Sequence, residues 1–369
     1  MEENQIKYHK DLLQSSNINF LIGSGLSRPF LPILGDIETL ISELDIKTEL
    51  ETGIKKYLKA SLFSKYFETV MLPNKCIIEK CGTADRKNTS ANYINFLKIL
   101  NKIIQKRGTT IISKQCNIFT TNIDLFLEVA VEEIGVEFND GFAGRINPTF
   151  NLSNYHRIVT RCSHNFENES KIPVFNLLKL HGSLNWRQYD NKICCSFDTQ
   201  LFDDIHEKSE RCNFIVINDG ETLDDIIGKV DVSKIDLIKV EEYLSLYKQL
   251  PVINPSKTKF EETTLGLYYY ELLRFLSNQL EKDNSVLYIM GFSMADEHIR
   301  EITLRVAKSN PTLQIFVMVY DSAAKDTIET NINNPDLHNL HYIVPVDGEN
   351  YSFDKINENI FGAILNNIG

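Results

Sequence analysis

Two glycines one residue apart, directly after an apolar run, could hold an anion such as a phosphate. Residues 19–28 read "NFLIGSGLSR", so Gly23 and Gly25 follow the run. A strand that ends this way usually lets another group approach the backbone closely. If a helix follows, the N–H groups of the turn and the helix dipole favour an anion. A tight strand-to-helix turn without a ligand is the alternative, and the short pattern alone does not decide between them.

Further apolar runs also end in polar or small residues. These endings contain Asn122 and Asp124 in "TTNID", His181 in "HGS", Gly291 and Ser293 in "GFS", and Asp321 after a tyrosine. Each has an ordinary explanation: an Asn or Asp can cap a following helix, and a lone histidine can be a satisfied surface or core residue. In doubly wound sheets, however, ligands bind at the carboxyl ends of the strands. Five such endings in one chain therefore predict a shared site.

The elements that would position these residues alternate along the chain. Short β-branched or apolar runs predict strands buried on both faces, over 18–22, 117–121, 174–180, 286–290 and 315–319. Helical patterns cover 125–134, closing at Gly135, and also 265–280 and 298–308. Strands alternating with helices predict an α/β fold, a mostly parallel sheet with helices on both faces.

Two stretches interrupt this alternation. Residues 40–113 contain amphipathic segments and predict a helical insertion. Residues 187–250 are mixed, acidic and less regular, which predicts a smaller module or excursion. We expect both to belong to a single domain spanning residues 1–369.

Composition excludes several classes of function. The chain has 369 residues and a net charge of −11, without a dense basic stripe, so direct nucleic-acid binding is not expected. No apolar run approaches the roughly 18 residues of a membrane span, and the polar N-terminus lacks a signal peptide, so we expect a cytoplasmic protein. The seven cysteines include no Cys-x-x-Cys pair. An odd number of cysteines in such a chain predicts reduced thiols. The missing Cys-x-x-Cys pair argues against a zinc module of the common spacing.

Four motifs together resemble a known family. "GSGLS", "FTTNID", "LLKLHGSLNW" and "YIMGFSMADEHI" lie in this order between residues 18 and 321. They resemble the Sir2-like, sirtuin-related domains of bacterial anti-phage defence proteins. In length and layout the chain is most similar to the Sir2-like subunit that pairs with a HerA-type hexameric ATPase. The resemblance implies a Rossmann-like fold that binds NAD⁺ and destroys it rather than deacylating proteins.

The resemblance also implies roles for single residues. Asn122 would lie at the nicotinamide ribose or the attacking water, and His181 would be the general base. The cofactor-binding residues would be Gly23, Ser24, Gly25 and Ser27 around the diphosphate, with Arg28, Asp124, Gly291, Ser293, Asp296 and Asp321. For four of these an ordinary role stays open: Arg28 could face solvent, Asp124 and Asp296 could cap helices, and Asp321 could be a solvated loop residue.

The chain departs from the sirtuin deacylases in two ways. The zinc-binding cysteine pairs are missing, and "PFLPILGDIETL" stands where an Asp-Phe-Arg segment is expected. We therefore expect no metal and predict hydrolysis of NAD⁺ to ADP-ribose and nicotinamide, gated by a homo-oligomeric assembly or by the ATPase partner. A non-catalytic subunit that senses NAD or ADP-ribose is the main alternative, and an NAD-dependent protein deacylase is the other.

Overall fold

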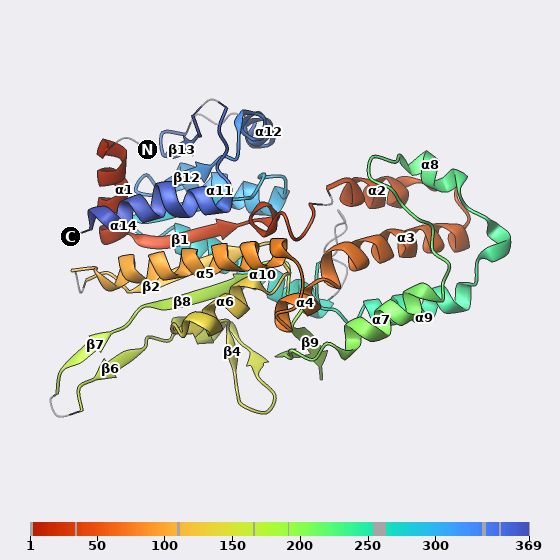
Figure 1. Ribbon diagram of the computed structural model, residues 1–369, viewed down its shortest axis with the longest axis horizontal. Helices are drawn as coiled ribbons and strands as arrows, with labels where there is room; N and C mark the ends of the chain where they lie inside the picture. The colour runs from red at the N-terminus through yellow and green to blue at the C-terminus, as the bar shows by residue number, and fades with distance from the viewer. Residues whose placement is uncertain are drawn as a thin grey trace.

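A seven-stranded sheet forms the centre of the molecule in the computed structural model, which describes residues 3–33, 35–108, 111–164, 167–190, 192–253, 263–333, 337–346 and 348–368. All neighbouring strands are parallel, in the order β13-β12-β11-β1-β2-β8-β3 (Figure 1). Their bounds are β13 Leu340–Ile343, β12 Gln314–Met318, β11 Ser285–Met290, β1 Asn17–Ile22, β2 Gln115–Thr120, β8 Val174–Lys179 and β3 Phe138–Asn139. The five predicted strands and the α/β class are confirmed.

Helices cover both faces of the sheet because each central strand is apolar on both sides. In β1, Phe20 packs into the core on one face and Leu21 into the core on the other. The first face is covered by α1 Glu3–Ser15, α5 Ala84–Gln105, α6 Phe126–Ile134, α13 Phe353–Ile356, the π-helical turn η5 Asn357–Gly362 and α14 Ala363–Asn367. The second is covered by α10 Thr263–Leu280, α11 Glu297–Ser309 and α12 Ser322–Ile332. The predicted helices over 125–134, 265–280 and 298–308 are α6, α10 and α11, and Gly135 ends α6 in a left-handed conformation.

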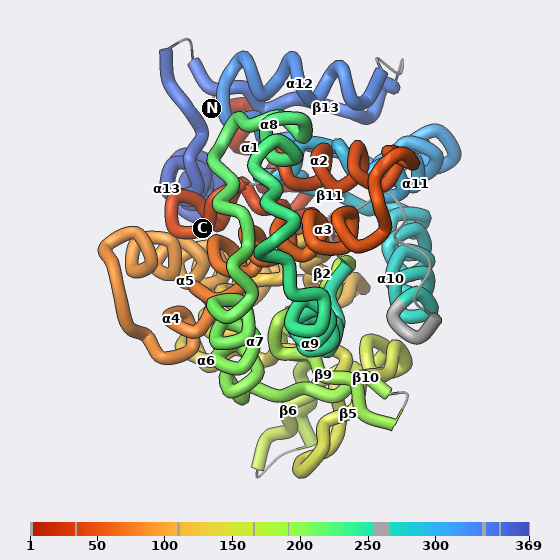
Figure 2. The backbone as a smooth tube through the Cα atoms, turned by 90° about the vertical axis from the view of Figure 1, so that its right-hand side faces the viewer, coloured from red at the N-terminus to blue at the C-terminus, as the bar shows by residue number. Residues whose placement is uncertain are grey.

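A helical lobe projects from one end of the sheet (Figures 1 and 2). It joins two segments that are far apart in sequence: α2 Gly35–Ile46 and α3 Thr52–Tyr66 pack with α7 Gln200–Glu210, α8 Leu223–Gly228 and α9 Leu237–Tyr247. Phe63 of α3 and Tyr247 of α9 stack with ring centroids 4.9 Å apart. Parts of the two expected interruptions therefore form one unit. Helix α5, also inside 40–113, packs on the sheet core instead.

Shorter elements complete the described fold. The chain passes from α3 through the π-helical turn η2 Phe67–Met71 to α4 Asn74–Ile78. A small antiparallel sheet contains β4 Phe142–Ala143, β5 Thr149–Phe150, β10 Lys192–Cys195 and β9 Trp186–Tyr189, and a hairpin pairs β6 Thr160–Cys162 with β7 Glu169–Lys171. Short 3₁₀ helices are η1 Ser24–Ser27, η3 Leu152–His156 and η4 Val232–Lys234.

Residues 109, 110 and 191, within the two expected interruptions, lie outside the described residues. No described helix is long and apolar enough to cross a membrane.

The sheet register brings the predicted strand endings to one edge. Ile22 at the end of β1 pairs with Thr120 of β2 and with Met290 of β11. Thr120 pairs in turn with Lys179 of β8. The turns that follow these four strands therefore start at the same level, at the carboxyl edge where the winding reverses on the two sides of β1.

Candidate functional site at the strand ends

The two glycine turns contact each other. The N–H of Gly23 donates to the Met290 carbonyl at 3.0 Å, and the N–H of Gly25 donates to the Gly291 carbonyl at 2.9 Å. A Cβ on Gly23 would lie 2.4 Å from the Gly291 oxygen, and one on Gly25 would lie 2.9 Å from the Gly291 Cα. The group that approaches the first turn is therefore the backbone of the second. These two N–H groups donate to carbonyls, so a diphosphate at this turn would need other donors. Ser24 and Arg28, on the same turn, are exposed.

Asn122, after β2, is held by two hydroxyl groups. Its Nδ2 donates to Ser27 Oγ at 3.2 Å and to the Tyr93 hydroxyl at 3.4 Å. Ser27 Oγ donates to Asp124 Oδ2 at 2.6 Å and lies 2.9 Å from the Tyr93 oxygen. Because a carboxylate only accepts, Ser27 must accept from Asn122 and Tyr93, which fixes the orientation of the amide. Asn122 is 6% exposed, and its Oδ1 is a buried acceptor without a hydrogen-bond partner among the described residues.

Asp124, rather than Asn122, satisfies the start of α6. Its Oδ1 accepts the N–H of Phe126 at 3.2 Å, while Oδ2 accepts from Ser27. The hydroxyl proton of Ser27 is thereby committed to Asp124, so Ser27 supports Asn122 instead of presenting a donor to solvent. Burial and the nearby Asp124 charge raise the pKa of Tyr93 well above its ordinary value, so its hydroxyl stays protonated.

A buried ion pair lies beneath the Asn122 loop. Lys179, the last residue of β8, contacts Glu128 Oε1 at 3.1 Å, and the two side chains are 3% and 6% exposed. The Lys179 ammonium also donates to the carbonyls of Asn122, at 3.3 Å, and of Asp124. Burial raises the pKa of Glu128, and the Lys179 charge opposes that rise. The backbone of the loop is thus fixed by a charge inside the core.

His181, after β8, pairs with Asp296. The two residues are joined by a contact of 3.2 Å between His181 Nε2 and Asp296 Oδ2. Asp296 Oδ1 accepts the N–H of Ile299 at 3.1 Å, so the same carboxylate caps α11. An ionised carboxylate accepts only, so Nε2 carries the proton and the lone pair of the neutral ring lies on Nδ1. The pair gives a base whose tautomer and orientation are set by a helix cap.

The turn that carries His181 is clamped by the chain that leaves the helical lobe. The N–H of Ile253 donates to the His181 carbonyl at 2.9 Å, and Val252 forms an antiparallel bridge with Gly182. Gly182 has φ +77°, and a Cβ there would lie 2.1 Å from the Pro251 oxygen. Only a glycine permits this approach. The histidine turn is therefore tied to α9 through residues 248–253.

The remaining predicted residues lie along the same edge but outside the Asn122 network. Gly291 supports the first glycine turn, and the Ser293 carbonyl accepts from Asn331 of α12 at 2.8 Å. Asp321 caps α12 by accepting the N–H of Ala324 at 2.8 Å. Asp124 and Asp296 thus have the capping role that was left open for them, and Asp321, for which a solvated loop position was the alternative, caps a helix as well.

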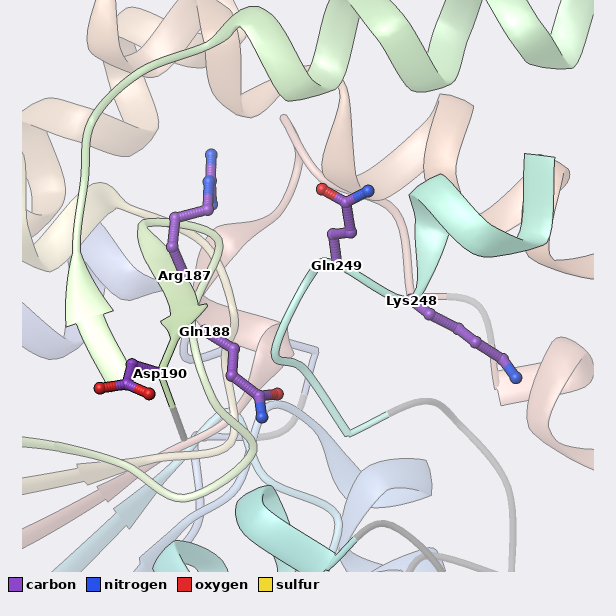
Figure 3. Close-up of a pocket in the computed structure, with 5 residues that line it drawn as sticks. All are labelled: Arg187, Gln188, Asp190, Lys248 and Gln249. Atoms are coloured by element: carbon purple, nitrogen blue, oxygen red, sulfur yellow. The ribbon is translucent and has the colours of Figure 1, made fainter. Parts of the chain in front are cut away.

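No metal cluster coincides with these residues in the part of the chain that the structure describes. No group of three or more His, Cys, Asp or Glu side chains gathers there as a metal site would require. An open depression of about 470 Å³ lies elsewhere, lined by Arg187, Gln188, Asp190, Lys248 and Gln249 (Figure 3). Its lining includes none of the predicted site residues. We call the residues that lie at the carboxyl ends of β1, β2, β8 and β11 the strand-end cluster. The depression lies outside this cluster.

Three residues at the cluster were missed from the sequence: Tyr93, Glu128 and Lys179. Lys179 carried a signal, because a lysine inside the apolar run "VFNLLKL" must find a partner if the strand is buried. Glu128 carried a weaker one, as the acidic residue on the apolar face of "FLEVAVEEI". Tyr93 carried none, since it is one of many apolar positions on the long helix α5.

A comparison with known protein families matches residues 117–340 to the family described as the SIR2-like domain. The match includes Asn122, Lys179, His181 and Asp296, whereas the first glycine turn and Tyr93 precede it. None of the curated proteins matches the chain.

Proposed function

Because the chain belongs to the SIR2-like domain family, whose members act on or with NAD⁺, we propose that it hydrolyses the bond between nicotinamide and ribose in NAD⁺. The family relation supports NAD⁺ as the substrate. The choice of hydrolysis over deacylation is supported by the residues at the strand ends and by the missing cysteine pairs of the zinc module. The products are ADP-ribose and nicotinamide.

One observation carries the proposal: Asn122 Oδ1 is buried and has no hydrogen-bond partner among the residues that the structure describes. A buried carbonyl oxygen without a donor costs roughly 1–3 kcal/mol. A water molecule or a ribose hydroxyl donating to Oδ1 would remove that cost. Because Ser27 and Tyr93 hold the amide nitrogen, the oxygen cannot rotate away. Asn122 is therefore suited to orient the attacking water at the nicotinamide ribose.

His181 would supply the base. Thr120 of β2 and Lys179 of β8 are paired in the sheet. Asn122 lies two residues after Thr120, and His181 lies two residues after Lys179, so both follow the strand ends at the same level. The hydrogen bond to Asp296 leaves Nδ1 to take a proton. Nicotinamide leaves as a neutral molecule, so the step needs little acid. Water adds its oxygen to the ribose carbon as the bond to nicotinamide breaks, and its proton passes to Nδ1 and then to solvent.

The nucleotide part of NAD⁺ would lie over the glycine turns. Ser24 and Arg28 are exposed there and could donate to the diphosphate, Arg28 with a charge-assisted bond. Gly291 and Ser293 would border the same groups from β11, and Asp321 would meet the adenosine ribose. Gly23 and Gly25 contribute by keeping the two turns close together.

We further propose that the chain is a gated, cytoplasmic NAD-depleting effector of anti-phage defence, with a HerA-type hexameric ATPase as its partner. The support is the resemblance of the four motifs to such subunits. Uncontrolled loss of NAD⁺ would harm the cell, so activity must depend on assembly. The helical lobe, which projects from the sheet, offers a surface for a homo-oligomer (Figure 2).

The test is to incubate the full chain with NAD⁺, with and without the ATPase, and to quantify NAD⁺, nicotinamide and ADP-ribose by mass spectrometry. Equal release of nicotinamide and ADP-ribose is expected, and Asn122→Ala should slow it by about a hundredfold or more. Asn151→Ala, which alters an exposed asparagine at η3, is the matched control. Binding of NAD⁺ without turnover in the complete assembly would support the sensing alternative. Turnover only with an acylated peptide would support a deacylase.

A further inference from the structure

Two cysteines lie in contact outside the proposed site. Cys76 is on α4, and Cys81 lies in the connection from α4 to α5. Their Sγ atoms are 2.7 Å apart, compared with about 2.05 Å in a disulfide. Cys81 is exposed and Cys76 is half-buried. A bond between them therefore needs only a small further approach, and one of the two thiols is open to solvent.

The conformation of the connection does not depend on the two sulfur atoms. Arg86 of α5 donates from Nη2 to the Lys80 carbonyl at 3.1 Å. The Thr83 side chain caps α5 by accepting the N–H of Arg86. These bonds turn the chain back towards α4 on either side of Cys81. The thiols are thus brought together by hydrogen bonds between side chains and backbone that involve neither sulfur and would remain after either sulfur is replaced.

We propose that Cys76 and Cys81 form a reversible disulfide when the protein meets a peroxide. The Cys81 sulfur attacks one peroxide oxygen, the O–O bond breaks, and a sulfenic acid and water form. The Cys76 sulfur then attacks the Cys81 sulfur and displaces a second water. Two thiols are oxidised by two electrons and hydrogen peroxide is reduced to two waters. A dithiol such as dithiothreitol, or an excess of a monothiol such as glutathione, reduces the disulfide again by thiol–disulfide exchange.

Exposure determines the order of these steps. Hydrogen bonding to Cys81 and partial burial raise the pKa of the Cys76 thiol. Cys81 is the exposed partner and meets the oxidant first. Cys76 then acts as the resolving thiol because it is already in contact. This is the arrangement found at redox-sensitive thiols, where an accessible cysteine lies beside a resolving one.

The position of the pair connects it to the strand-end cluster. Asn74, two residues before Cys76 on α4, accepts the N–H of Leu125 at 3.1 Å and is fully buried. Helix α5, which begins just after Cys81, carries Tyr93. The disulfide would therefore join the ends of the two helices that hold the Asn122 loop from this side.

The experiment exposes the full reduced chain to hydrogen peroxide and maps its peptides by mass spectrometry without reduction. We expect a peptide linking Cys76 to Cys81, lighter by two hydrogens, which disappears on treatment with dithiothreitol. We also expect a rise in Tm of about 3 °C on oxidation, from closure of a short loop in a chain of this size.

Three variants test the assignment. Cys76→Ser should lose the link and accumulate a Cys81 sulfenic acid that dimedone traps, and Cys81→Ser should lose both. Cys162→Ser, which removes an exposed thiol from β6, should behave like the unaltered chain. Oxidation of Cys81 to sulfinic acid without a link to Cys76, or its linkage to a different cysteine, would overturn the proposal.

Discussion

At the scale of single residues, Asn122 and His181 are expected to act on one step. Replacing either by alanine should lower turnover of NAD⁺ by about a hundredfold or more, because an oriented polar group or a general base is lost. The double variant should be little worse than either single one, since residues that act as a unit are not additive. Steady-state kinetics on the three variants measure this, and NAD⁺ affinity should fall far less than turnover.

His206→Ala is the control for these variants, because His206 pairs with Glu68 in the helical lobe, away from the strand ends. Thermal melts separate the catalytic from a structural role. If Asn122→Ala or His181→Ala turns over NAD⁺ at a nearly normal rate, that residue is not part of the catalytic site.

The contact between the glycine turns gives a stability prediction. Gly25→Ala should destabilise the protein by about 1–3 kcal/mol, because its Cβ would lie 2.9 Å from the backbone of Gly291, which cannot move without disturbing β11. Urea unfolding measures the change. Gly228→Ala is the matched control, since a Cβ there meets nothing within 4 Å. An equal effect in both variants would mean that backbone freedom, rather than the close approach, sets the cost.

The sequence predicted that these residue types gather at one edge, but not how they bond. The pairing of His181 with Asp296 joins residues 115 positions apart and depends on α11 starting beside the end of β8. The N–H groups of Gly23 and Gly25 looked available to a phosphate because the sequence does not reveal that β11 lies beside β1. Strand order, which follows from the whole packing of the chain, determined both outcomes.

At the scale of elements, the ion pair between β8 and α6 should dominate local stability. Lys179→Met should cost about 3–5 kcal/mol, because it leaves the Glu128 charge buried without its partner. The Lys179→Met, Glu128→Gln double variant should recover much of that loss. Chemical denaturation of the two variants measures the difference, and a double variant no more stable than the single one would contradict this account.

The same variants have a defined pH dependence. Burial raises the folded-state pKa of Glu128 above its ordinary value of 4.5. The folded state therefore holds this proton more tightly than the unfolded chain, and stability falls as pH rises from 4.5 to the folded value. Without Lys179 that window extends to higher pH. Lys179→Met should thus gain stability as the pH is lowered towards 4.5, whereas the double variant should not.

Helix α1 adds an opposite response to acid. His9 packs between β11 and β12, with Nδ1 3.0 Å from the Tyr288 hydroxyl, and burial, with a smaller effect of His341, lowers its pKa from 6.5 to about 4. The unfolded chain then binds the proton first, so stability is lost as pH falls from 6.5 to 4. His9→Gln should avoid about 2–3 kcal/mol of that loss of stability. Chemical denaturation at about pH 7 and at about pH 4.5 measures the difference. Exposed His164→Gln, the control, should follow the unaltered chain.

Elements with a long apolar signal were predicted, and those without one were not. The strand β3 has two residues, too few for any pattern, and forms only because β8 offers it an edge. The edge strand β13 is half-buried throughout, so it lacks the continuous apolar run of β1 or β11. The small sheet of β4, β5, β9 and β10 pairs very short segments that the chain brings together only after the main sheet is built.

At the scale of the whole molecule, the helical lobe is coupled to the histidine turn. Gly182→Ala should release the Pro251–Ile253 segment, because its Cβ would lie 2.1 Å from the Pro251 oxygen. We expect turnover to fall at least tenfold through misplacement of His181. Residues 248–253 should also become sensitive to limited proteolysis. Gly220→Ala, in open space with a similar positive φ, is the control. Unchanged turnover in Gly182→Ala would show that the clamp does not position His181.

The contact between Gly25 and Gly291 also orders events during synthesis. β1 leaves the ribosome long before one of its two sheet neighbours, β11, which begins at residue 285. A nascent chain shorter than this leaves one edge of β1 without its strand and the first glycine turn without its backing. Such long-range pairing is slow, and unpaired strand edges expose the chain to aggregation. The same delay keeps the strand-end cluster unfinished until β11 has been made, so with the proposed function a growing chain would not consume NAD⁺ before that point.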